Sequence, residues 1–179
     1  MNAIVANQEN PKDYGKMFHS ISLCLSKGLG APVGSVLLGD AAFIKQARRV
    51  RKVMGGGMRQ AGYLAAAGLF AMEHNINRLA EDHAHAKLLA SALVSCNWIG
   101  EIFPVETNIV IFEVATSESN SGKVSGSSSS LKTAPEIIAA LLSQNIRVSA
   151  MSPTHIRMVT HLGVTPEMIQ RTVEVLKGL

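Results

Sequence analysis

The stretch Ser22-Leu23-Cys24-Leu25-Ser26-Lys27-Gly28-Leu29-Gly30-Ala31-Pro32-Val33-Gly34-Ser35 decides how the rest of this chain of 179 residues is interpreted. Apolar and polar residues alternate from Ser20 to Ser26, which is the period of two that is typical of a β-strand. Lys27 is followed by Gly28 and Gly30, which can adopt positive φ and let a ligand or another backbone approach closely. A second short strand is predicted over 35–38. The pattern predicts a partly desolvated lysine at a strand end, where the neutral, nucleophilic amine is favoured.

Taken by itself, this pattern leaves alternatives open. A lysine beside a glycine turn is usually a solvated loop residue, and short motifs give false matches. Gly55-Gly56-Gly57 is either a flexible linker or a place where the backbone approaches another group. The basic residues over 45–52 form a solvated helix face, a nucleic-acid patch, or a site for a phosphate or carboxylate. Arg157 lies in a predicted strand over 156–160. It is either an ordinary exposed residue or a residue whose planar guanidinium binds a carboxylate.

Composition narrows the classes of function. With 47% hydrophobic residues, the chain can form one core, or one core and a small second lobe. No run approaches the roughly 18 apolar residues of a membrane span, and residues 1–16 show no signal or transit pattern, so we expect a cytoplasmic protein that contacts no membrane. The formal charge is +4, but only 4% of residues are aromatic, which argues against nucleic-acid binding. Cys24 and Cys96 are expected to be reduced thiols, and no metal site is expected.

Residues 1–16 lack periodicity and are predicted as a loop or frayed arm. A helix begins after Asp40, its N-cap, and ends at the three glycines. Its apolar stripe is expected at Phe43, Ile44, Ala47 and Val50. From Arg59 onward a long helix is predicted, kinked near Asn75. Apolar residues recur along it at steps of three and four at Leu69, Met72, Ile76, Leu79, His83, Ala86, Ala90 and Leu93. His83 is expected to be a buried histidine with its hydrogen bonds satisfied, and His74 and His85 are expected to be solvated.

The last part of the chain is predicted as a small α+β lobe. A buried strand over 107–114 precedes a Ser/Gly-rich surface loop over 115–131. Thr133, Pro135 and Glu136 form a capping box that opens a helix, which Asn145 closes. Strands over 146–150 and 156–160 follow, and Thr165 caps a last helix. The domains expected are an arm over 1–16, a large-domain part over 17–75 and a small domain over 76–179.

Three segments, taken together, resemble the low-specificity threonine aldolases. They are Leu25-Ser26-Lys27-Gly28-Leu29-Gly30-Ala31-Pro32-Val33-Gly34-Ser35, then Arg48-Arg49-Val50-Arg51-Lys52-Val53-Met54-Gly55-Gly56-Gly57-Met58-Arg59-Gln60, and Arg157-Met158-Val159-Thr160-His161-Leu162. The resemblance covers nearly the whole chain apart from its first residues and one inserted loop. It implies an α/β fold of the pyridoxal-phosphate fold type I class: the end of the large domain followed by a small C-terminal α+β domain.

The resemblance also implies roles for single residues. Lys27 would bind pyridoxal phosphate covalently. Ser26, directly before it, either places a hydroxyl near the cofactor phosphate or hydrogen-bonds its own backbone at the strand end. Arg59 and Lys52 would lie near the cofactor phosphate of a neighbouring subunit, so that a homo-oligomer is expected. Arg157 would bind the α-carboxylate of a small amino acid substrate. His161 is expected to be structural, and Gly163 stands where the family commonly has an acidic residue, so any local ion pair there is in doubt.

The activity that the resemblance implies is the cleavage of L-threonine or L-allo-threonine to glycine and acetaldehyde. Family features upstream of the lysine have no counterpart here: the ring-stacking histidine, the aspartate on the pyridine nitrogen, the glycine-rich phosphate turn and a second histidine. We therefore expect a partial form of the enzyme, the C-terminal half. Two alternatives stay open: an inactive fragment that acts by associating with other chains, and another fold type I activity, such as hydroxymethyl transfer or racemisation.

Overall fold

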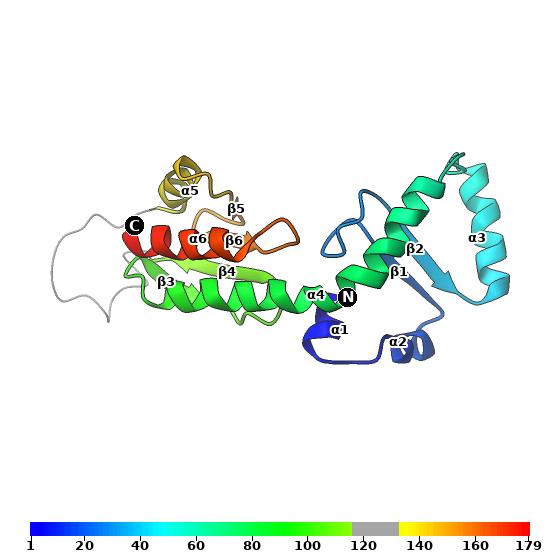
Figure 1. The fold of residues 1–179 in the computed structure, drawn as a ribbon, viewed down its shortest axis with the longest axis horizontal. Helices are drawn as coiled ribbons and strands as arrows, with labels where there is room; N and C mark the ends of the chain where they lie inside the picture. The colour runs from blue at the N-terminus through cyan, green and yellow to red at the C-terminus, as the bar shows by residue number, and fades with distance from the viewer. Residues whose placement is uncertain (116–132) are drawn as a thin grey trace. The chain divides into compact units, whose positions relative to one another are not determined.

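The computed structural model describes residues 1–115 and 133–179 (Figure 1). The chain divides into two compact units, Met1–Ala80 and Glu81–Leu179. Most of the surface loop predicted over 115–131 lies outside the described residues. Among the helices of the described ranges, none has the length and apolar character that crossing a membrane requires.

The first unit contains α1 (Asn2–Ala6), α2 (Pro11–Met17), β1 (Ser20–Cys24), β2 (Ser35–Gly39), α3 (Ala41–Val53) and the first part of α4 (Gly62–Val94). Two helices therefore occupy the segment expected to be a loop or arm. Asn10-Pro11 was interpreted as part of a loop, but in the structure it begins α2. The Asn10 side chain accepts a hydrogen bond from the Lys12 amide (3.1 Å), and Pro11 is the first helical residue. Proline is favoured there because the first helical N–H has no partner within the helix.

The predicted strands pair as an antiparallel hairpin, from Ser20 opposite Gly39 to Cys24 opposite Ser35. Polar residues of β1 are exposed, and Ile21 and Leu23 are half-buried, as the alternation predicts. Beside the hairpin lies a small core of Leu25, Leu29, Ala31, Ala71 and Leu79.

Helix α3 begins where the sequence predicts, because the Asp40 carboxylate accepts a hydrogen bond from the Phe43 amide (2.7 Å). It ends at Val53 with Met54 as its C-cap, and Gly55 adopts a φ of +81° that glycine tolerates. The stripe expected on α3 is only partly covered: Ile44 and Ala47 are half-buried, no residue of the helix is fully buried, and Val50 is 54% exposed. A helix pattern identifies an apolar face but not what covers it, and the described chain leaves this face partly open.

Helix α4 runs without interruption from Gly62 to Val94. Its predicted stripe is buried at Leu79, His83, Ala86 and Leu93, but Leu69 is 56% exposed. His74 is exposed and stacks on Phe70, with ring centroids 4.2 Å apart. The expectation that His85 is solvated is wrong, because its ring is half-buried and its Nδ1 is buried without a hydrogen-bond partner among the described residues.

The second unit is a four-stranded antiparallel sheet with helices packed on one face. Its strands are β3 (Ile99–Ile102), β4 (Ile109–Val114), β5 (Ser149–Ala150) and β6 (His155–Val159), in the order β3-β4-β6-β5. The last part of α4, α5 (Ala134–Ser143) and α6 (Pro166–Gly178) share its core. That core contains Val110, Phe112 and Val114 of β4 and Ile156 and Met158 of β6. Residues between these positions lie on the opposite face, which remains partly open.

The predicted helix ends of this unit are confirmed. The Thr133 amide donates to the Glu136 carboxylate (2.7 Å), which is half of the expected capping box. Asn145 adopts a φ of +60°, and the next amide, of Ile146, donates back to the Leu141 carbonyl (2.9 Å), which closes α5. The Thr165 hydroxyl accepts from the Met168 amide (3.3 Å) and caps α6.

Candidate functional site

Lys27 lies in a tight turn directly after β1. The Gly30 amide donates to the Lys27 carbonyl (2.9 Å), and Gly30 has a φ of +73°, which is unfavourable for residues with a side chain. The Ala31 amide then donates to the Leu25 carbonyl (3.0 Å) and closes the loop over the strand end. These hydrogen bonds fix the backbone that carries the lysine.

The same turn is anchored to α4. The Asn75 side-chain amide donates to the Leu29 carbonyl (2.7 Å), and Leu29 and Leu79 are almost completely buried. Gly28 is closely surrounded: a Cβ there would lie 3.0 Å from Asn2 Nδ2 and 3.1 Å from Leu79 Cδ2. Glycine at this position permits the close approach of the turn to α1 and α4.

The Lys27 side chain is exposed, and its amine makes no hydrogen bond or ion pair with any described residue. The expectation of partial desolvation is therefore wrong for this chain, since burial needs neighbouring atoms that the first unit does not supply. Ser26 is also exposed. The result is an exposed lysine side chain, without a polar partner among the described residues, on a backbone turn that hydrogen bonds fix.

Lys52 and Arg59 lie on either side of the three glycines, and both are exposed. Gly57 packs against the lysine stem, because a Cβ there would lie 2.5 Å from Lys52 Cδ. Neither cation forms a hydrogen bond or ion pair within the described ranges. The first unit thus contains Ser26, Lys27, Lys52 and Arg59, without polar contacts that link the lysine to the other cations.

Arg157 belongs to the second unit. It lies in the middle of β6, opposite Ile111 of β4 and Ser149 of β5. Its neighbours Ile156 and Met158 are buried, so Arg157 lies on the open face of the sheet, where it is half-buried. The guanidinium makes no hydrogen bond or ion pair with other described residues, and it can therefore accept a carboxylate.

A buried polar contact holds the strand that carries this arginine. The Thr160 hydroxyl donates to the Asp82 carbonyl of α4 (2.6 Å), and the Asn108 side chain donates to the Thr160 carbonyl (2.8 Å). Directly afterwards, His161 Nδ1 accepts a hydrogen bond from the Gly163 amide (3.1 Å). The carboxyl end of β6 is thus fixed on both sides, and His161 has the structural role expected of it within the turn.

The open face also carries a group that sequence reasoning missed. His155 Nδ1 lies 2.9 Å from both the Ser152 and the Thr154 hydroxyl oxygens, and its ring lies 5.7 Å from that of Phe103. His155 is two residues before Arg157, so both project from the same face of β6. The turn residues Ser152-Pro153-Thr154 were the available signal, because short hydroxyl side chains hydrogen-bond to nearby backbone.

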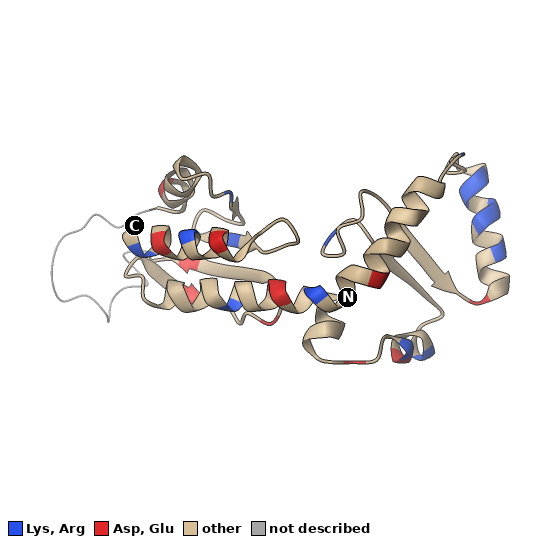
Figure 2. Ribbon diagram, in the orientation of Figure 1, with Lys and Arg blue, Asp and Glu red and all other residues tan. Residues whose placement is uncertain are grey.

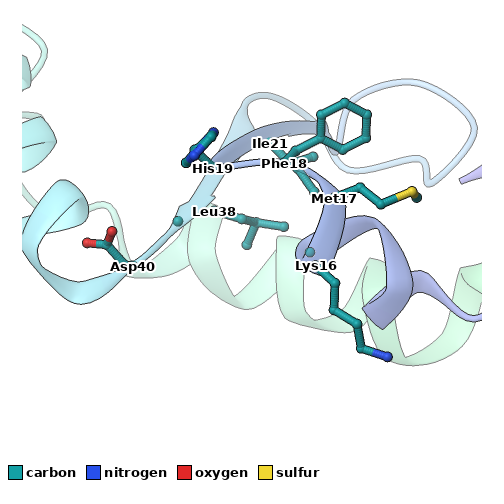
Figure 3. Close-up of a pocket in the computed structure, with 9 residues that line it drawn as sticks. Lys16, Met17, Phe18, His19, Ile21, Leu38 and Asp40 are labelled. Atoms are coloured by element: carbon teal, nitrogen blue, oxygen red, sulfur yellow. The ribbon is translucent and has the colours of Figure 1, made fainter.

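A hollow of about 490 Å³ lies where the end of α2 meets β1 and β2 (Figure 3). Its charged groups are engaged elsewhere: Lys16 pairs with Asp13 (2.7 Å), and Asp40 caps α3. None of the predicted site residues lines it. It is therefore separate from the candidate site.

Both cysteines are free thiols, as predicted. Cys24 is exposed on β1. Cys96 is half-buried and donates to the Leu176 carbonyl (3.3 Å), and burial raises the pKa of its thiol. Among the described residues, no cluster of three or more His, Cys, Asp or Glu could hold a metal ion.

Comparisons with known proteins identify the class. The family model of the beta-eliminating lyases matches residues 1–117, so this chain belongs to the beta-eliminating lyase family. Among its relatives, the low-specificity L-threonine aldolase of Escherichia coli O157:H7 is 38% identical over 168 residues, which cover 94% of this chain and 45% of the relative. Low-specificity L-threonine aldolase 1 of Arabidopsis thaliana is 38% identical over 159 residues, covering 88% of this chain and 41% of the relative. The chain thus spans under half the length of these relatives.

Solved structures agree on the fold. A threonine aldolase from Leishmania major superposes with a TM-score of 0.69 at 16% identity, covering 99% of this chain and 48% of that one. The histidinol-phosphate aminotransferase from Clostridium acetobutylicum gives a TM-score of 0.56 at 10% identity, covering 98% and 51%. These similarities confirm the predicted α/β fold of the fold type I class.

Proposed function

We propose that this chain contributes the cofactor-binding lysine and the substrate-binding arginine of a pyridoxal-phosphate-dependent threonine aldolase. The observation that carries the proposal is Lys27, whose exposed amine has no hydrogen bond or ion pair with the described residues and stands on a turn fixed by backbone hydrogen bonds. The relatives of this chain named low-specificity L-threonine aldolases supply the reaction. In that reaction the Cα–Cβ bond of threonine breaks to give glycine and acetaldehyde.

The residues present fit the cofactor by their chemistry. Lys27 would hold it through its amine, while Ser26, Lys52 and Arg59 offer a hydroxyl and two cations for a phosphate. Pyridoxal phosphate, when bound, withdraws electrons from the Cα of an attached amino acid. Because Lys52 and Arg59 make no polar contact with Lys27, we propose that these two cations serve the phosphate of a neighbouring subunit in a homo-oligomer.

Arg157 would bind the substrate carboxylate through two parallel N–H···O bonds. The contacts of Thr160 with Asp82 and Asn108 would hold β6 in register, so that the guanidinium keeps one position. Binding the carboxylate at a fixed point decides which bond of the substrate lies in the reactive orientation. Within this scheme, residues 17–75 form part of the cofactor-binding domain and 76–179 form the small domain.

Cofactor attachment is tested by mixing the chain with pyridoxal phosphate, reducing with borohydride and mapping the modified peptide. We expect label on Lys27, and its loss in Lys27→Arg. The matched control is Lys45→Arg, which changes another exposed lysine of the same unit. Equal label on several lysines, or label that survives Lys27→Arg, would remove Lys27 from the site.

A second candidate function, non-catalytic association with other chains, is favoured by the apolar surface of the first unit. Leu37 and Leu38 of β2 are each 44% exposed, and Met54 after α3 is 81% exposed. Apolar surface of this kind marks interaction sites. The two functions are separated by measuring glycine formation from threonine while the oligomeric state is followed by light scattering, since association without turnover supports only the second.

A further inference from the structure

His155 of β6 lies two residues before Arg157 in the second unit, and hydrogen bonds within its own turn hold its ring. Nδ1 lies 2.9 Å from both the Ser152 and the Thr154 hydroxyl oxygens. The Ser152 oxygen accepts from two backbone amides, those of Thr154 (3.2 Å) and His155 (3.0 Å). Because a hydroxyl oxygen has two lone pairs, the Ser152 hydrogen remains to be donated, and Nδ1 is closer to it than the Thr154 oxygen (3.4 Å). The neutral ring therefore carries its proton on Nε2.

The Nε2–H group of this histidine is not used within the unit, since it makes no hydrogen bond with a described residue. Acidic residues of the sheet lie on β3 and β4, and an arginine lies on β6 (Figure 2). Glu113 of β4 is directly opposite His155. Its carboxylate lies toward β3, because a Cβ at Gly100 would be 3.0 Å from Glu113 Oε2, and it makes no hydrogen bond or ion pair with described residues. The imidazole therefore keeps a donor for a ligand.

The place beside Arg157 also has an apolar border. Side chains two residues apart on a strand project from the same face, about 7 Å apart, so His155 and Arg157 are neighbours there. The Phe103 ring lies 5.7 Å from the His155 ring. Phe103 continues β3, where its amide donates to the carbonyl of Ile111 (3.0 Å), the residue opposite Arg157. A cation, a neutral donor and an apolar ring thus border one place, through contacts that lie entirely within the second unit.

We propose that His155 determines substrate specificity by donating from Nε2 to the β-hydroxyl oxygen of an amino acid whose carboxylate binds Arg157. The inference rests on the proposed function, because it takes Arg157 as the carboxylate partner. In threonine the β-carbon carries a hydroxyl and a methyl group, which match the imidazole N–H and the Phe103 ring. As the hydroxyl proton leaves, its oxygen gains negative charge, which a positioned donor stabilises. With its own proton on Nε2, His155 is not the base that removes the hydroxyl proton.

The test measures amino acid binding to the full chain by NMR titration. L-Threonine is compared with L-2-aminobutyrate, which has the same carbon skeleton without the hydroxyl. We expect L-threonine to bind about three- to tenfold more tightly, which is the contribution of one hydrogen bond. His155→Phe keeps a ring and removes the donor, so the ratio of the two affinities should fall to about one. His155→Gln keeps an N–H group near the position of Nε2 and should restore part of the ratio, with Trp98 fluorescence showing that both variants fold.

The tautomer has its own measurement, which needs no ligand. Long-range ¹H–¹⁵N correlation spectra distinguish a protonated ring nitrogen from a bare one, and we expect the neutral ring of His155 to carry its proton on Nε2. Ser152→Ala should weaken that preference, because Nδ1 loses a donor. The matched control is Ser143→Ala, whose hydroxyl donates to the Ala140 carbonyl (2.7 Å) in the same unit and should leave the preference unchanged. A proton on Nδ1 in the unchanged chain would overturn the inference.

Arg157→Gln separates the two ways of failing. It should weaken both ligands by the same factor, and affinities that do not change would overturn the proposed function. If Arg157→Gln weakens both ligands and His155→Phe leaves their ratio unchanged, only the role of His155 is wrong. An equal loss of both affinities in His155→Phe would place the imidazole at the carboxylate and would also overturn its role at the hydroxyl. Binding of neither ligand to the full chain would overturn both proposals.

Discussion

The two units differ in how much of their apolar surface they bury for themselves. In the second unit one face of the sheet is covered, and Phe112, Trp98 and Leu176 are among its buried residues. The first unit buries only five apolar residues, and α3 buries none. A two-stranded hairpin is marginally stable in water, so the first unit depends on other surfaces for its stability. The unit that presents Lys27 is therefore the less self-sufficient one.

Amide exchange should show the largest difference between the units. We expect amides of β1, β2 and α3 to exchange at least about 1000-fold faster than those of β4 and β6, because exchange follows the free energy of local opening. Mass spectrometry of peptic fragments measures these exchange rates. Similar protection across both units would mean that the small core around Leu29 and Leu79 is sufficient.

Removing a large side chain from the second unit should have the next largest effect. We expect Phe112→Ala to lower the free energy of unfolding of this unit by about 3–5 kcal/mol, since it leaves a cavity in the core. Trp98 is the sole tryptophan of the chain and contacts Phe112 edge to face (5.9 Å), so its fluorescence reports urea unfolding of this unit alone. Leu37→Ala, at an exposed position of the other unit, is the control and should leave that transition in place.

A smaller effect is expected at the turn that carries the lysine. Gly30→Ala places a side chain at a φ of +73° and should cost about 1–2 kcal/mol locally. Exchange of the Gly30 and Ala31 amides, which close the turn, measures this cost. Gly62→Ala is the control, because a Cβ there meets no atom within 4 Å. Unchanged exchange in Gly30→Ala would show that the turn does not hold Lys27 in one conformation.

The smallest effect is a pH dependence in the second unit. Burial, the largest influence on His83, lowers its pKa below the usual value, although the neighbouring Asp82 acts in the opposite direction. The unfolded chain then binds more protons as pH falls, so this histidine makes the unit less stable below about pH 6.5. We expect His83→Gln to flatten the slope of unfolding free energy between pH 7 and 5, as measured by Trp98 fluorescence. An unchanged slope would mean that another group controls the acid response.

Features set by a few neighbouring residues could be predicted from the sequence. Asp40, Thr133 and Thr165 mark helix starts correctly because a cap is a local hydrogen bond. The alternation of β1 and the stripe of α4 from Leu79 onward are also correct, because periodicity determines which face is apolar. Strand β3 was missed, since Gly100 and Glu101 interrupt its short apolar pattern.

Features that depend on distant surfaces could not be predicted in this way. The burial of α3 and the desolvation of Lys27 require atoms from outside the first unit, and no pattern in residues 41–53 specifies them. The partly buried position of His85 likewise depends on which elements pack beside α4. For the candidate site, sequence alone located the lysine at a strand end and Arg157 on a strand, but the roles of Lys52 and Arg59 rest on family resemblance.

The contrast between the two thiols has a practical consequence for labelling chemistry. Maleimides react with the thiolate, and burial disfavours that form at Cys96, whose thiol also donates to the Leu176 carbonyl. Cys24 is exposed on β1, three residues before Lys27. The natural sequence thus offers one preferred attachment point for a fluorophore or spin label beside the lysine. Cofactor capture at this turn can then be observed directly, without introducing or deleting a cysteine.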